Sequence, residues 1–69
     1  MNRLKELREK RRISQVYLGM ELHMAQNTIS QYEIGEREAG YKVLIAIADY
    51  FGVSIDYLLE RTDNPQVNQ

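Results

Sequence analysis

Residues 14–35 constrain the fold most strongly, because their apolar side chains recur at the spacing of two short helices joined by a tight turn. Leu18 and Leu22 would face a core from the first of these helices. Ile29 and Tyr32 would face the same core from the second helix. The segment therefore predicts two packed helices whose polar side chains are left to face outward.

The outward positions of this segment carry amide side chains, at Gln15, Gln26, Asn27 and Gln31. Asn and Gln each hold a hydrogen-bond donor and an acceptor in one plane, and this pair matches the N6 and N7 edge of adenine in the major groove of DNA. Two short helices, of which the second presents side chains that read bases, form the layout of a helix-turn-helix. We therefore expect a surface that reads DNA.

The rest of the chain is expected to be all-α, because five helices and no strand fit the sequence. Ser14 and Ser54 are suitable N-caps for the second and fifth helices, since a serine oxygen accepts from N–H groups of the first turn. Gly35 and Gly52 would end the third and fourth helices. The expected helices span about residues 2–10, 14–22, 25–33, 40–51 and 54–60, and together they would form a compact five-helix bundle.

The length of 69 residues predicts one domain with a small core. The chain has no cysteine and one histidine, so no disulfide is possible and we expect no metal and no cofactor. Residues 1–61 would form the domain and residues 62–69 a flexible tail. No apolar run approaches the roughly 18 residues of a membrane span, and no signal peptide is visible. We therefore expect a cytoplasmic protein without a membrane partner.

Charge is distributed unevenly along the chain, although the net charge is only −1. Residues 1–12 hold six basic and two acidic side chains, which gives +4, whereas residues 13–69 hold three basic and eight acidic ones, which gives −5. A domain that binds DNA mainly through charge would be more basic than this. We expect modest non-specific affinity, with specific binding resting on base contacts; alternatively, the basic segment is only a solvated helix face.

Three stretches of the sequence resemble the bacterial and phage repressor-like helix-turn-helix family, also called the Xre or Cro/cI type. They are LKELREKRRISQ at 4–15, TISQYEIGER at 28–37 and IADYFGVSIDYLLERTDNP at 47–65. The resemblance covers nearly the whole chain, and all three stretches occur in the family's order and spacing. It implies a five-helix bundle that binds double-stranded DNA sequence-specifically as a homodimer.

Carried over by position, the resemblance implies that Gln26, Asn27 and Gln31 contact bases from the third helix. Asn27 and Gln31 share a helix face because they are four residues apart. Thr28 lies near the same groove, where its methyl group would meet a thymine methyl or only pack internally.

The resemblance also implies contacts that position the protein on the DNA backbone. Gln15 would lie beside a phosphate and the first reading side chain, and Ser14 begins a helix whose N–H groups can face phosphate. Arg37 lies just past the third helix, where the family often contacts a phosphate. Arg8 is expected to pair with Glu33 and to tie the first helix to the end of the third, with a phosphate contact in addition. The alternative is two unrelated surface charges, which would contribute almost nothing.

Four positions depart from the family pattern. Gly19 stands where alanine is usual, which costs roughly 0.5–1 kcal/mol within a helix unless a close approach needs it. His23 stands where the turn usually has glycine, and histidine tolerates the left-handed region better than most residues. Ala25 replaces a Ser or Thr cap, a loss of roughly 1 kcal/mol. Glu36 replaces a common lysine, and it would repel phosphate. We expect a weakened recognition unit.

The tyrosines outnumber what a small core needs, with five in the chain. Tyr50, Tyr57 and Leu59 come from the C-terminal helices, where the family commonly dimerises, and tyrosine is favoured at interfaces. They form the expected dimer patch, although scattered exposed apolar residues are also normal. A dimer would address half-sites about one helical turn apart, roughly 34 Å, and so a palindromic operator.

Taken together, these features predict a sequence-specific regulator of transcription, most simply a repressor. The alternative is a protein-interaction module of the same fold, such as an antitoxin or an anti-repressor, and the acidic second half of the chain and Glu36 favour it. An enzyme is not expected, because the chain lacks a cysteine nucleophile, a glycine-rich phosphate loop and a spaced metal cluster. No small-molecule substrate is evident.

Overall fold

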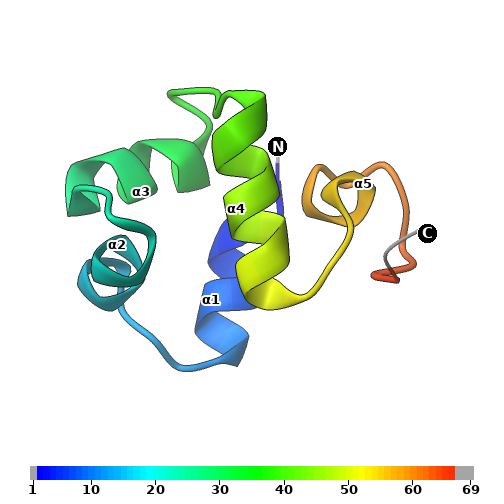
Figure 1. Cartoon of the computed structure of the whole chain (residues 1–69), viewed down its shortest axis with the longest axis horizontal. Coiled ribbons are helices and arrows are strands. Elements are labelled where there is room, and N and C mark those ends of the chain that lie inside the picture. Colours follow the sequence, from blue (N-terminus) through cyan, green and yellow to red (C-terminus); the bar gives the residue numbers. More distant parts are fainter. Residues whose placement is uncertain (1, 67–69) are drawn as a thin grey trace.

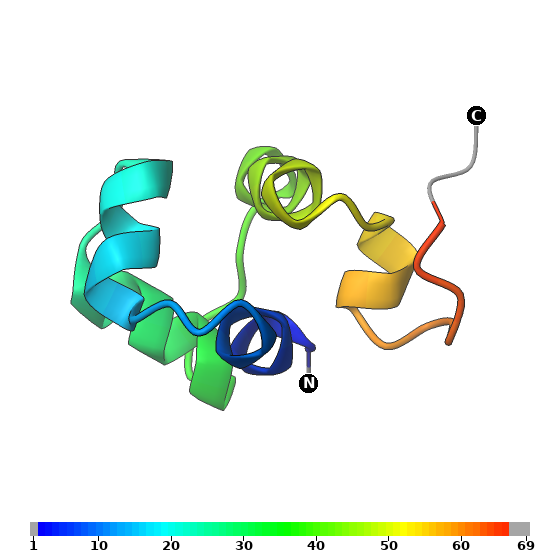
Figure 2. The ribbon, with the colours of Figure 1, turned by 90° about the horizontal axis from the view of Figure 1, so that it is seen from below.

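The computed structural model describes residues 2–66, which contain five helices and no strand. The helices are α1 (Leu4–Lys10), α2 (Gln15–Leu22), α3 (Gln26–Ile34), α4 (Tyr41–Phe51) and α5 (Ile55–Leu58). The expected all-α five-helix fold is confirmed. Figures 1 and 2 show α2 and α3 packed together at one end of the molecule, α5 at the other end, and α1 and α4 between them.

Each helix contributes one fully buried apolar side chain to a shared core. These residues are Leu4, Leu18, Ile29, Ile47 and Leu58, each at most 2% exposed. Burying a Leu or Ile side chain contributes about 1.5–3 kcal/mol relative to leaving it exposed, so five such residues hold all five helices to one centre. The position of α3 is therefore fixed by the whole bundle.

The helix boundaries follow the capping residues. The Oγ atoms of Ser14 and Ser54 accept hydrogen bonds from the third residues of α2 and α5, at 2.9 and 3.0 Å. The fifth helix ends at Leu58, two residues earlier than expected, because Glu60 takes a left-handed conformation with a φ of 63°. The N–H of Arg61 then donates to the carbonyl of Asp56 at 2.8 Å, which closes the chain after the helix.

The turn between α2 and α3 explains two of the departures from the family pattern. His23 ends α2 in the left-handed conformation, with φ 56° and ψ 45°, as expected for a turn residue. A Cβ atom on Gly19 would lie 2.5 Å from the carbonyl oxygen of Met24, so glycine permits the chain to turn this closely. Gly19 thus serves a close approach, the second of the two alternatives that the sequence left open for this glycine. Ala25 precedes α3 without a side-chain cap, as expected.

The N-terminal segment contacts the C-terminal one. The guanidinium of Arg3 donates to the carbonyl oxygens of Tyr57 and Thr62, at 2.8 and 3.2 Å, and to Asp63 Oδ1 at 3.0 Å. Within the tail expected to be flexible, residues 62–66 are described, and residues 67–69 lie outside the described residues. Flexibility of the tail stays a prediction. No helix within residues 2–66 is long and apolar enough to cross a membrane.

Candidate nucleic-acid interface

The first turn of α3 presents two amide side chains to solvent. Gln26 and Asn27 are exposed, whereas Thr28 and Gln31 are half-buried. Ile29 lies on the side of α3 opposite Asn27 and is fully buried in the core. The burial of Ile29 fixes the rotation of α3 about its axis, so the amides of the first turn point away from the bundle.

An ion pair joins α1 to α3 behind these amides. Arg8 Nε donates to Glu33 Oε2 at 2.6 Å and Arg8 Nη2 donates to Glu33 Oε1 at 3.3 Å, so the pair expected from the sequence is formed. Arg8 Nη1 also donates to the carbonyl of Ile13 at 2.8 Å. The Glu33 side chain is only 2% exposed. The hydrogen bond to Glu33 raises the pKa of Arg8 above its ordinary value, against the opposing effect of burial.

Two further hydrogen bonds connect this ion pair to the exposed amide. Gln15 Nε2, at the start of α2, donates to Glu33 Oε1 at 3.0 Å. Gln26 Nε2 donates in turn to Gln15 Oε1 at 3.2 Å. The four side chains, Arg8, Glu33, Gln15 and Gln26, therefore form one continuous relay from α1 to the surface of α3. The sequence placed Gln15 beside the first reading side chain, but it carried no signal for the contact between Gln15 and Glu33.

The basic N-terminal segment is less available to a ligand than its charge indicates. Arg11 Nη1 donates to the carbonyl of Tyr50 at 3.0 Å, and its guanidinium lies 4.9 Å from the ring centre of Phe51. Arg3 and Arg8 are also engaged within the protein. The other three basic side chains of the segment, Lys5, Lys10 and Arg12, are exposed. Much of the +4 charge is therefore structural, which strengthens the expectation of modest non-specific attraction to DNA.

Arg37 lies in the loop between α3 and α4 and is exposed. Its guanidinium lies 5.9 Å from the ring centre of Tyr32, and its backbone N–H donates to the carbonyl of Gln31 at 3.3 Å. Glu36 and Glu38 flank it and are also exposed. The loop thus offers one cation between two carboxylates, beside the end of α3.

A sequence model described as helix-turn-helix matches residues 4–58. The chain belongs to the helix-turn-helix family. The matched residues include all five helices, and α2, the turn at His23 and α3 form the helix-turn-helix itself. The relay from Arg8 to Gln26 therefore joins α1 to both helices of the motif.

Two curated proteins of Bacillus subtilis (strain 168) are similar to this helix-turn-helix chain. One is an uncharacterized HTH-type transcriptional regulator, YqaE, and the other is the HTH-type transcriptional regulator AnsR. Each is 36% identical over 66 residues, which are 96% of this chain and 57% of the relative. The chain thus spans little more than half the length of either relative. No solved structure matches it significantly.

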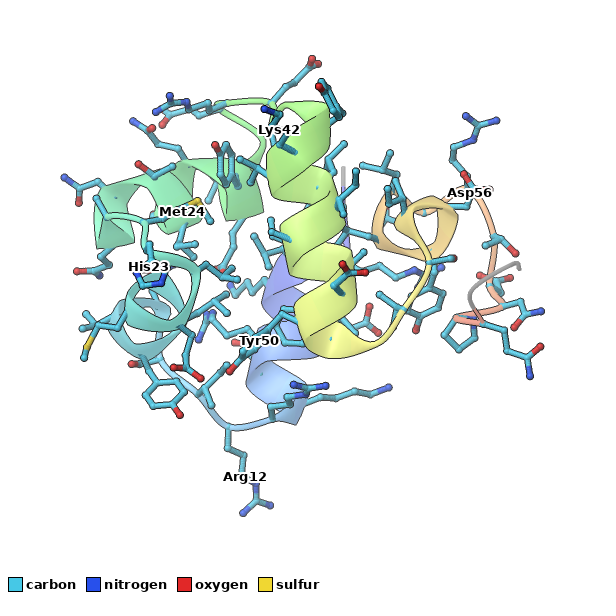
Figure 3. All side chains as sticks on the ribbon, viewed as in Figure 1. Arg12, His23, Met24, Lys42, Tyr50 and Asp56 are labelled. Carbon is cyan, nitrogen blue, oxygen red and sulfur yellow. The ribbon has the colours of Figure 1, made fainter. Side chains whose placement is uncertain are left out.

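The expected dimer patch is not one surface of the helix-turn-helix domain. Tyr50 lies on the side of α4 that faces α2, away from α5, and its hydroxyl donates to Glu21 Oε1 at 3.5 Å (Figure 3). Tyr57 lies under the guanidinium of Arg3, which is 4.2 Å from its ring centre. Both tyrosines and Leu59 are half-buried. The guanidinium of Arg11 likewise lies 5.3 Å from the ring centre of Tyr50. The sequence placed the two tyrosines outward because it could not indicate that arginines from the N-terminal segment lie over both rings.

Other apolar side chains are exposed instead. Ile34 is 63% exposed in the last turn of α3 and shares the face of Asn27 and Gln31, at i+7 and i+3. That spacing could have identified it from the sequence. Large exposed apolar side chains also lie on α2 and α4, at Val16, Tyr17, Met20, Tyr41 and Ile45. Among the described residues, no cluster of His, Asp and Glu is arranged to hold a metal ion.

Proposed function

We propose that this chain binds double-stranded DNA sequence-specifically and regulates transcription, with α3 in the major groove. The observation that carries the proposal is the hydrogen bond from Gln26 to Gln15, which holds an exposed amide in a defined direction at the start of α3. Base edges are read by the N-terminal residues of the second helix in a helix-turn-helix, and amides match adenine. The names of the two Bacillus subtilis relatives support the same activity.

Within this proposal the polar residues divide into two groups. Gln26, Asn27, Gln31 and Thr28 read bases, and Thr28 contributes least because it is half-buried and its side chain is shorter than that of the equally half-buried Gln31. Gln15, Ser14, Arg8 and Arg37 position the domain on the phosphates. Three of the guanidinium donors of Arg8 are already used within the protein, so its contribution to phosphate binding is small. Arg37 is the main charged contact of the group.

We further propose that the protein acts as a repressor and as a homodimer on a palindromic operator, in the cytoplasm. Tyr57 and Leu59 remain in the proposed dimer surface, whereas Tyr50 belongs to the contact between α4 and α2. A separate groove between α4 and α5 is lined by Ile45, Val53 and Ile55 among others. Weak attraction to phosphate makes a dimer important, since two linked half-sites add their affinity.

The deciding experiment is a selection from random DNA duplexes, followed by a salt titration on the selected site. A palindromic site should be enriched, and log K should fall with log salt by a shallow slope, because few phosphates are neutralised. The control is a variant in which Gln26, Asn27 and Gln31 are all changed to alanine; these side chains lie outside the core, so the fold should be retained. Enrichment of the same site by this control would contradict the proposed reading surface.

A specific observation favours the second candidate, a protein-interaction module. Val16 and Met20 are 52% and 70% exposed on one face of α2, at i and i+4. Contiguous exposed apolar side chains are typical of surfaces that contact other proteins. If the selection enriches no sequence and the protein instead binds a protein partner that Met20→Ser abolishes, this second function replaces the first.

A further inference from the structure

The hydrogen bonds of the relay can be donated in only one order, from Gln26 to Gln15 to Glu33, because the buried end of the relay is a carboxylate. An ionised carboxylate accepts hydrogen bonds and cannot donate them. Both oxygens of Glu33 accept from Arg8, and Oε1 also accepts from Gln15. Gln15 must therefore turn its NH2 group toward Glu33, which leaves its Oε1 facing Gln26. Gln26 must then turn its own NH2 group toward Gln15, as the 3.2 Å contact shows.

This direction decides what Gln26 offers to a base. An amide NH2 group has two N–H donors, and Gln15 takes one of them. One N–H and the carbonyl oxygen of Gln26 remain, in a fixed order. Adenine presents one acceptor, N7, and one donor, N6, whereas guanine presents two acceptors, N7 and O6. If the Gln26 amide is held in this one orientation, its N–H can donate to N7 of adenine while its oxygen accepts from N6. Opposite guanine, the same oxygen would face the acceptor O6.

We propose that Glu33 is a positioning residue for base selection: it fixes the direction of the Gln26 amide through Gln15, and thereby makes Gln26 select adenine over guanine. The inference rests on the proposed function, because it concerns the site where α3 meets DNA. The Glu33 side chain is itself only 2% exposed, so a base in the groove cannot reach it directly. Its role is thus distinct from stabilising the packing of α1 on α3, which the ion pair with Arg8 does in any case.

A single substitution should reverse the relay. In Glu33→Gln, the new amide at position 33 keeps its oxygen toward Arg8 Nε, which makes the shorter contact of 2.6 Å; it gives up the 3.3 Å contact with Nη2 and turns its NH2 group toward Gln15. Gln15 must then accept, and its NH2 group faces Gln26. The side-chain amide of Gln26 therefore flips by half a turn, so that its carbonyl oxygen and its NH2 group exchange positions. The order of donor and acceptor in the groove is exchanged, and the match to adenine is lost.

A second substitution should restore the original orientation of the Gln26 amide. In the double variant Glu33→Gln/Gln15→Glu, the new carboxylate at position 15 accepts from the new amide at position 33 and also from Gln26. Gln26 returns to its original direction. The double variant has the same net charge as the original protein, so a change in overall electrostatics does not explain a difference between them.

The test measures binding to duplexes with adenine or guanine at the base pair that Gln26 reads, which Gln26→Ala identifies as the pair where preference disappears. We expect the original protein to favour adenine by about tenfold or more, Glu33→Gln to lose this ratio, and the double variant to regain it. Gln15→Ala keeps the ion pair intact and should also lower the ratio, so the proposal stays testable if Glu33→Gln unfolds.

The outcomes separate the possible failures. If Glu33→Gln and Gln15→Ala weaken all sequences alike and keep the adenine ratio, Glu33 is only structural and the proposal is overturned. A folded double variant that fails to regain the ratio overturns the proposal as well.

If the original protein enriches no DNA sequence, the proposed function fails, but NMR of the free protein still tests the relay. The side-chain amide signals of Gln26 should shift in Glu33→Gln and return in the double variant, and unchanged signals would overturn the relay.

Discussion

The carbonyl oxygen of Met24 lies 2.5 Å from the point where a side chain on Gly19 would begin. The two residues are also joined by a 2.7 Å hydrogen bond from the N–H of Met24 to the carbonyl of Gly19. Together these contacts bring the end of the turn directly against α2. The angle between α2 and α3 therefore depends on the absence of a side chain at position 19.

Replacing Gly19 with alanine should destabilise the protein, although alanine is the better helix former. The gain in helix propensity is about 1 kcal/mol, whereas forcing an atom into a filled space costs about 1–3 kcal/mol. We expect a net loss of about 1 kcal/mol in the free energy of unfolding, measured by urea denaturation. Ala46→Gly is the control for helix propensity, because position 46 is exposed within α4; this variant should lose about 1 kcal/mol, since glycine is the weaker helix former. A gain in stability in Gly19→Ala, which helix propensity alone requires, would contradict the steric argument.

Replacing Arg8 with alanine should cost more than any other single charge removal in α1. It leaves the Glu33 carboxylate buried without its cation, and breaking a buried ion pair costs about 3 kcal/mol or more. Lys5→Ala removes the same charge from an exposed position of the same helix and should change the free energy of unfolding by less than about 0.5 kcal/mol. Denaturation of both variants in one buffer checks the prediction, and similar losses would show that net charge, and not the pair, is responsible.

The fold was predictable to a large degree because its determinants are local. The serines that cap α2 and α5, the left-handed residue at His23 and the helical spacing of buried residues such as Ile29 are all visible in the sequence. The site was less predictable because it depends on partners that are distant along the chain. The contact of Gln15 with Glu33 joins residues 18 positions apart, and Arg3 covers Tyr57 from the other end of the chain.

Replacing Ala25 with serine should stabilise the protein. Ala25 has the extended conformation of an N-cap, with φ −67° and ψ 148°, but its side chain offers no acceptor to the first turn of α3, and the N–H of Thr28 donates only to the backbone carbonyl of Ala25, at 3.1 Å. A serine oxygen there should accept from the N–H of Thr28, as Ser14 accepts from Tyr17, and should raise the free energy of unfolding by about 1 kcal/mol. Ala46→Ser, at an exposed position within α4, should give no such gain. A thermal denaturation series is sufficient, and a gain in both variants would rule out the cap as its source.

The hydroxyl of Tyr50 should lose its proton at a higher pH than that of an ordinary tyrosine. Partial burial raises the pKa of its hydroxyl above the ordinary value, and the negative charge of Glu21 raises it further. The pKa of Tyr50 is higher in the folded than in the unfolded state, so folding favours the protonated hydroxyl. The contribution of the protonated hydroxyl to the free energy of unfolding is complete below the ordinary tyrosine pKa and is lost as the pH rises through the folded value. Glu21→Gln should lower the pKa of Tyr50, as followed by NMR of its ring signals at alkaline pH. No change in this variant would show that Glu21 does not act on the hydroxyl.

Arg37 and Gln31 should differ in the kind of DNA binding that they support. Arg37→Ala removes an exposed cation beside α3, so it should weaken binding to all sequences alike and reduce the salt slope by about 1. Gln31→Ala and Gln26→Ala each remove an amide from the reading face, so each should relax preference at one base pair by about 1–3 kcal/mol and leave the slope unchanged. Binding isotherms on the selected site and on its single-base variants, at several salt concentrations, separate the two effects. If all three variants lose the same affinity on every sequence, the division between reading and positioning residues is wrong, and α3 contributes charge and shape but no base selection.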